Sequence, residues 1–295
     1  MPKAEEVVRI YGQEQDFQMN DDLEGHVTLH SLDLFNGHLF GGQVFSQAMN
    51  ACQLWLSHQK STLKIHMNHG VFLKAGTPYE PLEYKVTPLG LGRTFQRFQV
   101  QAYQKGSLIF QSMVSAQRPE EPYIQHQQKM PNAPLPETLM TDEELKRKIT
   151  GQDGPQSERP IQIRVATPEN YLKAYPAESH HGFWFRYAFN DESAAEALRP
   201  EQQRVLLAYA SDYGFLGGLF VPQDISIRQS SYFLTSLDHS LWYYGDYKSH
   251  EWAYFEIESP VADHGRGSVY GRIYQQGTLV AVASQEGLLR RREKI

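Results

Sequence analysis

The stretch Tyr103-Gln104-Lys105-Gly106-Ser107-Leu108 returns 171 positions later as Tyr274-Gln275-Gln276-Gly277-Thr278-Leu279. Two more pairs repeat in the same order at nearly the same offset: His69-Gly70-Val71-Phe72 with His239-Ser240-Leu241-Trp242, and Gly92-Arg93 with Gly265-Arg266. Three matches in one order indicate that a unit of about half the chain is duplicated. Stacked arrays need at least about three repeats, so the sequence predicts two similar halves packed as a pseudo-dimer.

The composition predicts a folded chain with a large core. Of the 295 residues, 40% are hydrophobic and only 21% are charged, which argues against disorder. The single cysteine, Cys52, rules out an internal disulfide framework, is expected in the core and suits a reducing compartment. The net charge of −6 argues against a nucleic-acid binder. Neither a signal-peptide pattern nor an apolar run of roughly 20 residues is found, so we expect a cytoplasmic protein without a membrane span.

The first half is expected to form a helix followed by antiparallel strands. Residues 43–58 carry one apolar helical stripe, formed by Val44, Ala48, Ala51, Cys52 and Trp55. Alternation over Phe98 to Tyr103 predicts a half-buried strand. A hairpin follows at Gln104 to Ser107, and Leu108 to Ala116 is expected to return as the next strand.

The second half repeats this plan. Pro200 to Phe220 has a helical pattern, and Val269 to Tyr274 and Thr278 to Leu289 are expected strands. Three prolines between Met130 and Pro136 predict an extended linker, and Thr141 is expected to begin a helix beyond it. We therefore expect an N-terminal unit at 1–130, a proline-rich linker at 131–165 and a C-terminal unit at 166–295. The fold class is α+β, with two sheets edge to edge so that each covers the other's exposed edge.

Asp212 is a carboxylate in an apolar helical stripe. If residues 204–219 form one helix, a sector of about 80° at ~3.6 residues per turn contains Val205, Ala208, Tyr209, Asp212, Leu216 and Leu219. Burying an unpaired carboxylate is costly, so we expect hydrogen-bond partners or a shifted pKa. Two interpretations are open: a functional carboxylate, or a structural one that bonds nearby backbone or caps a break at Gly214.

A second polar cluster, Ser236-Leu237-Asp238-His239-Ser240, lies near the start of a strand. Alternation predicts that Ser236, Asp238 and Ser240 share one face, with Thr235, Leu237 and His239 on the other. The first half has His66-Met67-Asn68-His69 at the corresponding place. His66 and His69 lack a nearby third ligand and are expected on opposite faces, so we predict no metal site.

Gln285 interrupts an apolar row in the second half only. The row runs Leu279, Ala281, Ala283 and Gln285, and the first-half residue aligned with Gln285 is Val114. This amide is either functional or a hydrogen-bonded core residue. The chain lacks a Gly-x-Ser-x-Gly elbow, a phosphate-binding loop, a His-Glu-x-x-His motif and a cysteine cluster. Serine hydrolysis, nucleotide hydrolysis and zinc chemistry therefore lose support.

Several motifs are similar to those of the acyl-CoA thioesterase II family. In the first half they are Phe40-Gly41-Gly42-Gln43-Val44, His66 to Phe72 and Ser112 to Gln117. In the second half they are Ala208-Tyr209-Ala210-Ser211-Asp212, Leu237-Asp238-His239-Ser240-Leu241-Trp242 and Gln285-Glu286-Gly287. The resemblance covers nearly the whole chain. It implies a tandem double hotdog, in which each half wraps a curved antiparallel sheet around a long helix.

The resemblance also implies a catalytic trio of an aspartate, a hydroxyl residue and a glutamine, which match Asp212, Ser236 and Gln285. Many bacterial relatives have threonine at the hydroxyl position, and serine keeps the oxygen. The implied reaction is hydrolysis of acyl-CoA to fatty acid and CoA, with no cofactor and no metal, by a homo-oligomer (dimer or tetramer). All three residues lie in the second half, so the first half is expected to keep the fold without a catalytic set.

We expect a water nucleophile rather than a covalent one. Asp212 would orient the water or accept its proton, while Ser236 and Gln285 would hold it. Backbone N–H groups at Gly41-Gly42 would stabilise the oxyanion. The phosphates of the substrate require a local basic rim, for which the candidates are Arg93, Arg266, Arg272 and Arg290 to Arg292.

Two alternative functions are open at this point. A hotdog enoyl-CoA hydratase or dehydratase would use an aspartate with a histidine about five residues on, where this chain has Gly217. A non-catalytic acyl-CoA binding protein would be indicated by loss of the aspartate, and Asp212 is present. Both alternatives are therefore disfavoured relative to hydrolysis.

Overall fold

The computed structural model describes residues 3–34, 37–151, 160–166, 180–222 and 232–291. Its helices are α1 (Ala4–Arg9), α2 (Gly41–His58), α3 (Asp142–Thr150), α5 (Glu192–Glu196) and α6 (Pro200–Ser211), with 3-10 turns η1 (Glu14–Asp16), η2 (Pro136–Thr138) and η3 (Phe215–Phe220). Its strands are β1 (Gln18–Met19), β2 (Gly25–Leu29), β3 (Lys64–Phe72), β4 (Leu82–Leu91), β5 (Phe95–Gln104), β6 (Ser107–Gln117), β7 (Ile161–Val165), β8 (His180–Tyr187), β9 (Tyr232–Ser236), β10 (Asp238–Tyr243), β11 (Ala253–Asp263), β12 (Arg266–Gln275) and β13 (Thr278–Arg291).

The strands form one antiparallel sheet of 13 described strands, in the order β1-β2-β4-β5-β6-β3-β10-β13-β12-β11-β8-β7, with β9 beside β13. The two halves join at β3 and β10, where His69 pairs with Ser240 and Gly70 with His239. These residues begin the two echoed motifs, so the junction coincides with a pseudo-twofold axis. The expected edge-to-edge arrangement and the tandem hotdog architecture are confirmed.

The echoed hairpins have the same geometry. Lys105 and Gly106 have φ of 50° and 73°, and Gln276 and Gly277 have φ of 51° and 78°. Two successive left-handed residues are what a two-residue turn with the twist of the flanking strands requires. The hairpins predicted at both positions are confirmed.

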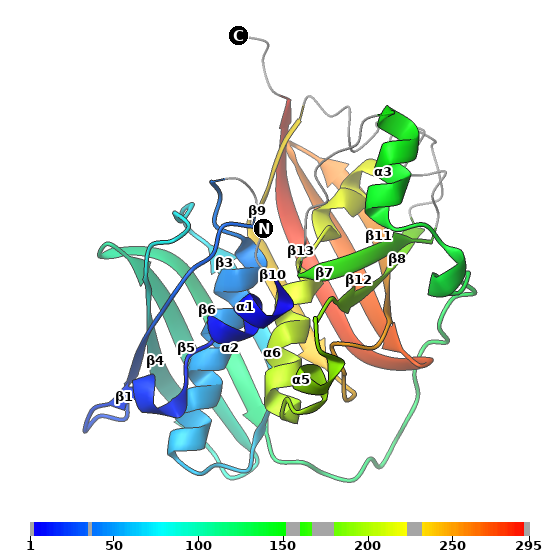
Figure 1. Cartoon of the computed structure of the whole chain (residues 1–295). Coiled ribbons are helices and arrows are strands. Elements are labelled where there is room, and N and C mark those ends of the chain that lie inside the picture. The colour runs from blue at the N-terminus through cyan, green and yellow to red at the C-terminus, as the bar shows by residue number, and fades with distance from the viewer. Residues whose placement is uncertain (1–2, 35–36, 152–159, 167–179, 223–231, 292–295) are drawn as a thin grey trace.

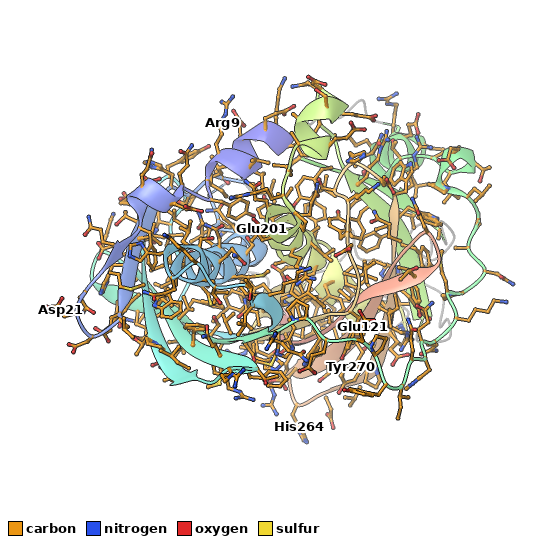
Figure 2. All side chains as sticks on the ribbon, turned by 90° about the horizontal axis from the view of Figure 1, so that it is seen from below. Arg9, Asp21, Glu121, Glu201, His264 and Tyr270 are labelled. Atoms are coloured by element: carbon orange, nitrogen blue, oxygen red, sulfur yellow. The ribbon has the colours of Figure 1, made fainter. Side chains whose placement is uncertain are left out.

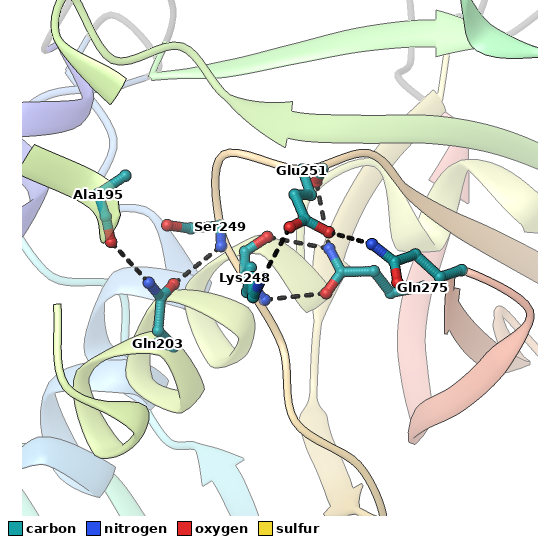
Figure 3. Close-up of polar contacts among 7 residues, drawn as sticks. Ala195, Gln203, Lys248, Ser249, Glu251 and Gln275 are labelled. Atoms are coloured by element: carbon teal, nitrogen blue, oxygen red, sulfur yellow. Dashed lines mark hydrogen bonds and ion pairs between the residues drawn. The ribbon is translucent and has the colours of Figure 1, made fainter. Parts of the chain in front are cut away.

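A glutamine just before each hairpin turn fixes a neighbouring loop. Gln104 accepts from the N–H of Thr77 at 2.8 Å and donates to its carbonyl at 2.9 Å. Gln275 makes the same two bonds, both of 2.9 Å, with the backbone of Lys248 (Figure 3). Each amide pairs with the N–H and C=O of one residue. The loop after β3 and the loop after β10 are therefore held at the same point in the two halves.

The long helices α2 and α6, one from each half, lie side by side on the concave side of the sheet (Figure 1). A Cβ on Gly42 would lie 2.6 Å from the backbone oxygen of Tyr209, so glycine permits this close approach. Side chains fill the space between helices and sheet, whereas the labelled Arg9, Asp21 and His264 lie on the outside (Figure 2). Cys52, on α2, is fully buried as expected.

The second helix is shorter than predicted. The expectation of one helix over Pro200 to Phe220 is wrong, because α6 ends at Ser211 and Asp212 is its C-cap. Gly214 then takes a left-handed conformation with φ of 71°, and the chain continues as η3. The apolar stripe continues beyond the break because Leu216 and Leu219 of η3 are also buried against the sheet.

The stretch between the halves contains ordered elements. The helix predicted to begin at Thr141 is confirmed, since the Thr141 hydroxyl accepts from the Glu144 N–H at 3.1 Å. β7 pairs with β8 at the edge of the second half. Before this stretch, Gln127 bonds Gly277 and Leu279 of the second hairpin at 2.8 and 3.1 Å. The unit boundaries at 130 and 165 stay a prediction. Among the described residues, no helix is long and apolar enough to cross a bilayer.

Candidate functional site

The structure brings Asp212, Ser236 and Gln285 together. The Gln285 side-chain nitrogen donates to Asp212 Oδ1 at 2.6 Å and to Ser236 Oγ at 3.0 Å. Asp212 follows α6, Ser236 ends β9 and Gln285 lies in β13, so three separate elements contribute. Gln285 is buried, whereas Asp212 and Ser236 are partly exposed. Both donor hydrogens of Gln285 are thus used to hold an acid and a hydroxyl in place.

A bulge at Leu237 turns Ser236 toward Gln285. Ser236 pairs with Gly287, and Ser240 pairs with Ser284. The chain therefore advances four residues from Ser236 to Ser240, while its partner β13 advances only three. One extra residue moves everything before it to the opposite face. The prediction that Ser236, Asp238 and Ser240 share a face is therefore wrong. Asp238 does not join the trio, and its carboxylate accepts from the N–H of Glu286 at 2.7 Å.

The surroundings of Asp212 shift the pKa of its carboxyl group upward. Burial raises the pKa of Asp212 from 3.8 to about 7, while hydrogen bonds from Gln285 and from the backbone of Gly42 act in the opposite direction. A carboxylate in largely apolar surroundings, with only a few donors to its ionised form, is a usual setting of a general base. This environment favours the functional interpretation of Asp212 over the purely structural one.

The first half supplies the other wall of the site. A Cβ on Gly41 would lie 2.9 Å from Asp212 Oδ2 and 3.1 Å from the ring of Phe72, so the carboxylate lies directly against the start of α2. The N–H groups of the first helical turn have no acceptor within their own helix, and the helix dipole is positive there. The start of α2 is therefore a place for negative charge.

A cavity of about 840 Å³ opens onto Asp212 and Ser236. Its volume falls within the range of small-molecule sites. Its apolar wall comes from both halves: Val44, Phe72, Ile109, Phe110, Phe215, Leu216 and Leu234. His38, Lys74 and Thr235 add polar groups. The arrangement can hold an apolar chain with a carbonyl group at its polar end.

The corresponding place in the first half has no such trio. Val114, the counterpart of Gln285, is fully buried. His66, the counterpart of Ser236, bonds Ser115 at 2.9 Å, and the ring of His69 lies 4.7 Å from that of Trp242. Within the described residues, no group of three or more His, Cys, Asp and Glu side chains could hold a metal. The asymmetry expected between the halves at Val114 and Gln285 is present.

Sequence reasoning missed a buried pair beside the trio. His239 is fully buried between Phe45 and Phe215, and its Nε2 lies 2.8 Å from Ser211 Oγ. Burial lowers the pKa of His239 to about 3, so the ring stays neutral. Ser211 directly precedes Asp212, and the pair therefore fixes the last turn of α6. The Asp-His-Ser motif was the available signal, but alternation assigned this histidine only to the face away from Ser236.

Comparisons with known proteins agree with this architecture. A family model described as acyl-CoA thioesterase matches residues 153–288, and one described as acyl-CoA thioesterase N-terminal domain matches residues 31–117. Acyl-coenzyme A thioesterase 8 of Mus musculus is 32% identical over 87% of this chain and 82% of its own. Acyl-CoA thioesterase 2 of Haemophilus influenzae is 32% identical over 88% of this chain and 90% of its own.

Solved structures extend the comparison to the fold. An acyl-CoA thioesterase II from Mycobacterium marinum is 27% identical and has a TM-score of 0.71. The match covers 98% of this chain and 97% of the other. A protein with the hotdog fold from Alicyclobacillus acidocaldarius has the same TM-score of 0.71 at 13% identity, over 98% of both chains. The fold is a double hotdog. The chain belongs to the acyl-CoA thioesterase family.

Proposed function

We propose that this protein hydrolyses acyl-CoA thioesters to a fatty acid and CoA at the Asp212–Ser236–Gln285 site. The observation that carries the proposal is the Gln285 amide, which bonds Asp212 at 2.6 Å and Ser236 at 3.0 Å beside the cavity. Membership of the family and the relatives named acyl-CoA thioesterases support the substrate class.

Asp212 acts as the general base. With a pKa raised to about 7 by burial, its carboxylate is substantially ionised at neutral pH and accepts a proton from the attacking water. Ser236 Oγ accepts from Gln285 and donates to no described residue, so its hydrogen is available to the water. Fixing the water in this way removes much of the entropic barrier to attack.

The start of α2 stabilises the charge that develops on the carbonyl oxygen. The N–H group of Gly41 belongs to the first turn, beside the Asp212 carboxylate, whereas that of Gly42 already bonds this carboxylate. When that carboxylate takes a proton, its negative charge is replaced by that of the oxyanion. A thiolate leaves readily, so a strong leaving-group acid is not required.

Release of free CoA tests the activity. Acyl-CoAs from short to long chains are mixed with the protein and a thiol-trapping dye, with Asp212→Asn as the control. A thioesterase releases free thiol at a rate that depends on Asp212. A hydratase or a binding protein releases none, and that outcome would contradict the proposal.

Direct attack by water is proposed over an anhydride on Asp212, because two neutral hydrogen-bonding groups next to a carboxylate suit the positioning of a water. A single turnover in ¹⁸O-water with excess enzyme distinguishes the two routes. Direct attack labels the fatty acid and leaves Asp212 unlabelled. Label in the peptide that contains Asp212, with an unlabelled first-turnover acid, would establish the covalent route. The cytoplasmic location and the homo-oligomeric state stay predictions.

A further inference from the structure

The loop that follows β3 forms part of the cavity mouth and is firmly held. The N–H groups of Leu73 and Lys74 both donate to the carbonyl of Ile109, at 2.8 and 3.2 Å. Farther along, Gln104 bonds both backbone groups of Thr77. A Cβ on Gly76 would lie 2.4 Å from Leu39, so the loop also packs against the segment before α2. Lys74 is thus presented from a fixed backbone.

The second half repeats this backbone but not this side chain. Tyr244 and Gly245 both donate to the carbonyl of Val280, at 2.9 and 3.2 Å. The bonds match those of the first-half loop, with Gly245 where the first half has Lys74. The next residue in the second half is Asp246, which lies 3.9 Å from Arg204. Only the copy whose loop reaches the cavity carries a cation at this position.

Lys74 is an exposed cation that lines the cavity, and its ammonium group has no hydrogen-bond or ion-pair partner among the described residues. Two arginines expected at the rim are engaged elsewhere. Arg272 pairs with Glu256 at 2.8 Å and with Glu258 at 3.1 Å, and these carboxylates raise its pKa further. Arg266 pairs with Glu286 at 3.1 Å. Arg292 lies outside the described residues.

We infer that Lys74 binds a phosphate group of the coenzyme at the mouth of the cavity. The inference rests on the proposed function, since acyl-CoA is the substrate. CoA is a polyanion and the chain carries a net charge of −6, so a local positive group is needed to counter repulsion. An ammonium on a fixed loop meets a phosphate as a point charge, without the fork geometry of arginine.

Two matched substrates test the inference at low ionic strength. Decanoyl-CoA and decanoyl-pantetheine share the thioester and acyl chain, but only the first carries phosphates. We expect Lys74→Gln to raise KM for decanoyl-CoA about three- to fivefold, as for an exposed charge pair, with an unchanged KM for decanoyl-pantetheine. Lys74→Arg should restore most of the affinity. The KM increase should shrink as salt screens the pair.

The control is Lys64→Gln, which removes an exposed lysine at the opposite end of β3, outside the cavity. Inhibition by free CoA provides a second readout, because loss of the phosphate contact weakens CoA in Lys74→Gln and not in Lys64→Gln. Equal KM changes for both substrates, or no change for either, would overturn the inference. If wild-type protein hydrolysed neither thioester, the proposed function itself would fail, and the inference with it.

Discussion

The two halves of this protein differ at one equivalent, buried strand position, which holds an apolar side chain in the first half and a polar one in the second. Val114 in β6 and Gln285 in β13 follow equivalent hairpins, and both are almost completely inaccessible. The valine needs no partner, whereas the amide must be hydrogen-bonded and is held against Asp212 and Ser236. Duplication thus keeps two copies of the scaffold and permits a costly polar cluster in only one of them.

The half without the trio still contributes to the site. The start of α2 lies against the Asp212 carboxylate, and Phe72 and Phe110 line the cavity. The cavity therefore lies between the halves. The polar groups of the site are thus concentrated in the second half, while the first half supplies the helix start beside the carboxylate and much of the apolar wall.

Removing the carboxylate should have the largest effect. Asp212→Asn keeps the shape of the side chain but cannot accept a proton, so kcat should fall about 10²–10⁴-fold. Because burial raises the pKa of Asp212 from 3.8 to about 7, wild-type stability falls as pH rises through that window. The uncharged variant should therefore melt no lower than wild type at pH 8. Near-wild-type turnover by folded Asp212→Asn would show that Asp212 is not the base and that the catalytic group lies elsewhere.

Removing the neutral members of the trio should have a smaller effect. Gln285→Ala and Ser236→Ala each delete hydrogen-bonding groups rather than the base, so kcat should fall about 10–100-fold. The groups act as a unit, so the double variant should lose less than the product of the two single losses. Fully multiplicative losses in steady-state kinetics would show that Ser236 and Gln285 act independently.

Crowding the start of α2 tests the contribution of the first half. A methyl group at position 41 would lie 2.9 Å from Asp212 Oδ2, closer than carbon and oxygen normally approach. Gly41→Ala should displace the carboxylate and lower kcat about tenfold, since small misplacements near reacting atoms are costly. The matched control is Gly90→Ala, where a Cβ meets nothing within 4 Å. Equal activity of both variants would mean that the start of α2 does not position the Asp212 carboxylate.

Truncating Val114, the first-half counterpart of Gln285, should leave kcat unchanged. Val114→Ala removes buried methyl groups and should lower the free energy of unfolding by about 1–3 kcal/mol. Denaturant unfolding and CoA release, measured on the same preparation, give the two quantities. A large fall in kcat without loss of stability would indicate that the first half takes part in the chemistry.

The sequence predicted the duplication from its repeated motifs, and local patterns singled out Asp212 and Gln285, whereas the choice of Ser236 as their partner came from the family resemblance. Lys105-Gly106 and Gln276-Gly277 have turn chemistry that short-range rules capture, and a charge or amide in an apolar row stands out. The early end of α6 was hidden because Leu216 and Leu219 continue the apolar stripe beyond Gly214. The bulge at Leu237 was hidden because no residue type marks the extra position, so alternation was counted straight across it.

Tertiary contacts could not be derived in the same way. Ser211 and His239 lie 28 positions apart, and their bond depends on how α6 meets β10. Gly41 and Asp212 come from different halves, so their contact depends on the pseudo-twofold packing of α2 on α6. Neither contact can be predicted from hydrophobic periodicity or turn chemistry.

The pH dependence of kcat/KM measures the ionisation of Asp212, the proposed base, in the free enzyme. Burial raises the pKa of Asp212 to about 7, so wild-type kcat/KM should rise about tenfold per pH unit below 7 and level off above it. In Asp212→Asn the residual kcat/KM should not show this rise with pH. A rise of kcat/KM near pH 7 that persists in Asp212→Asn would mean that a group other than Asp212 is the base.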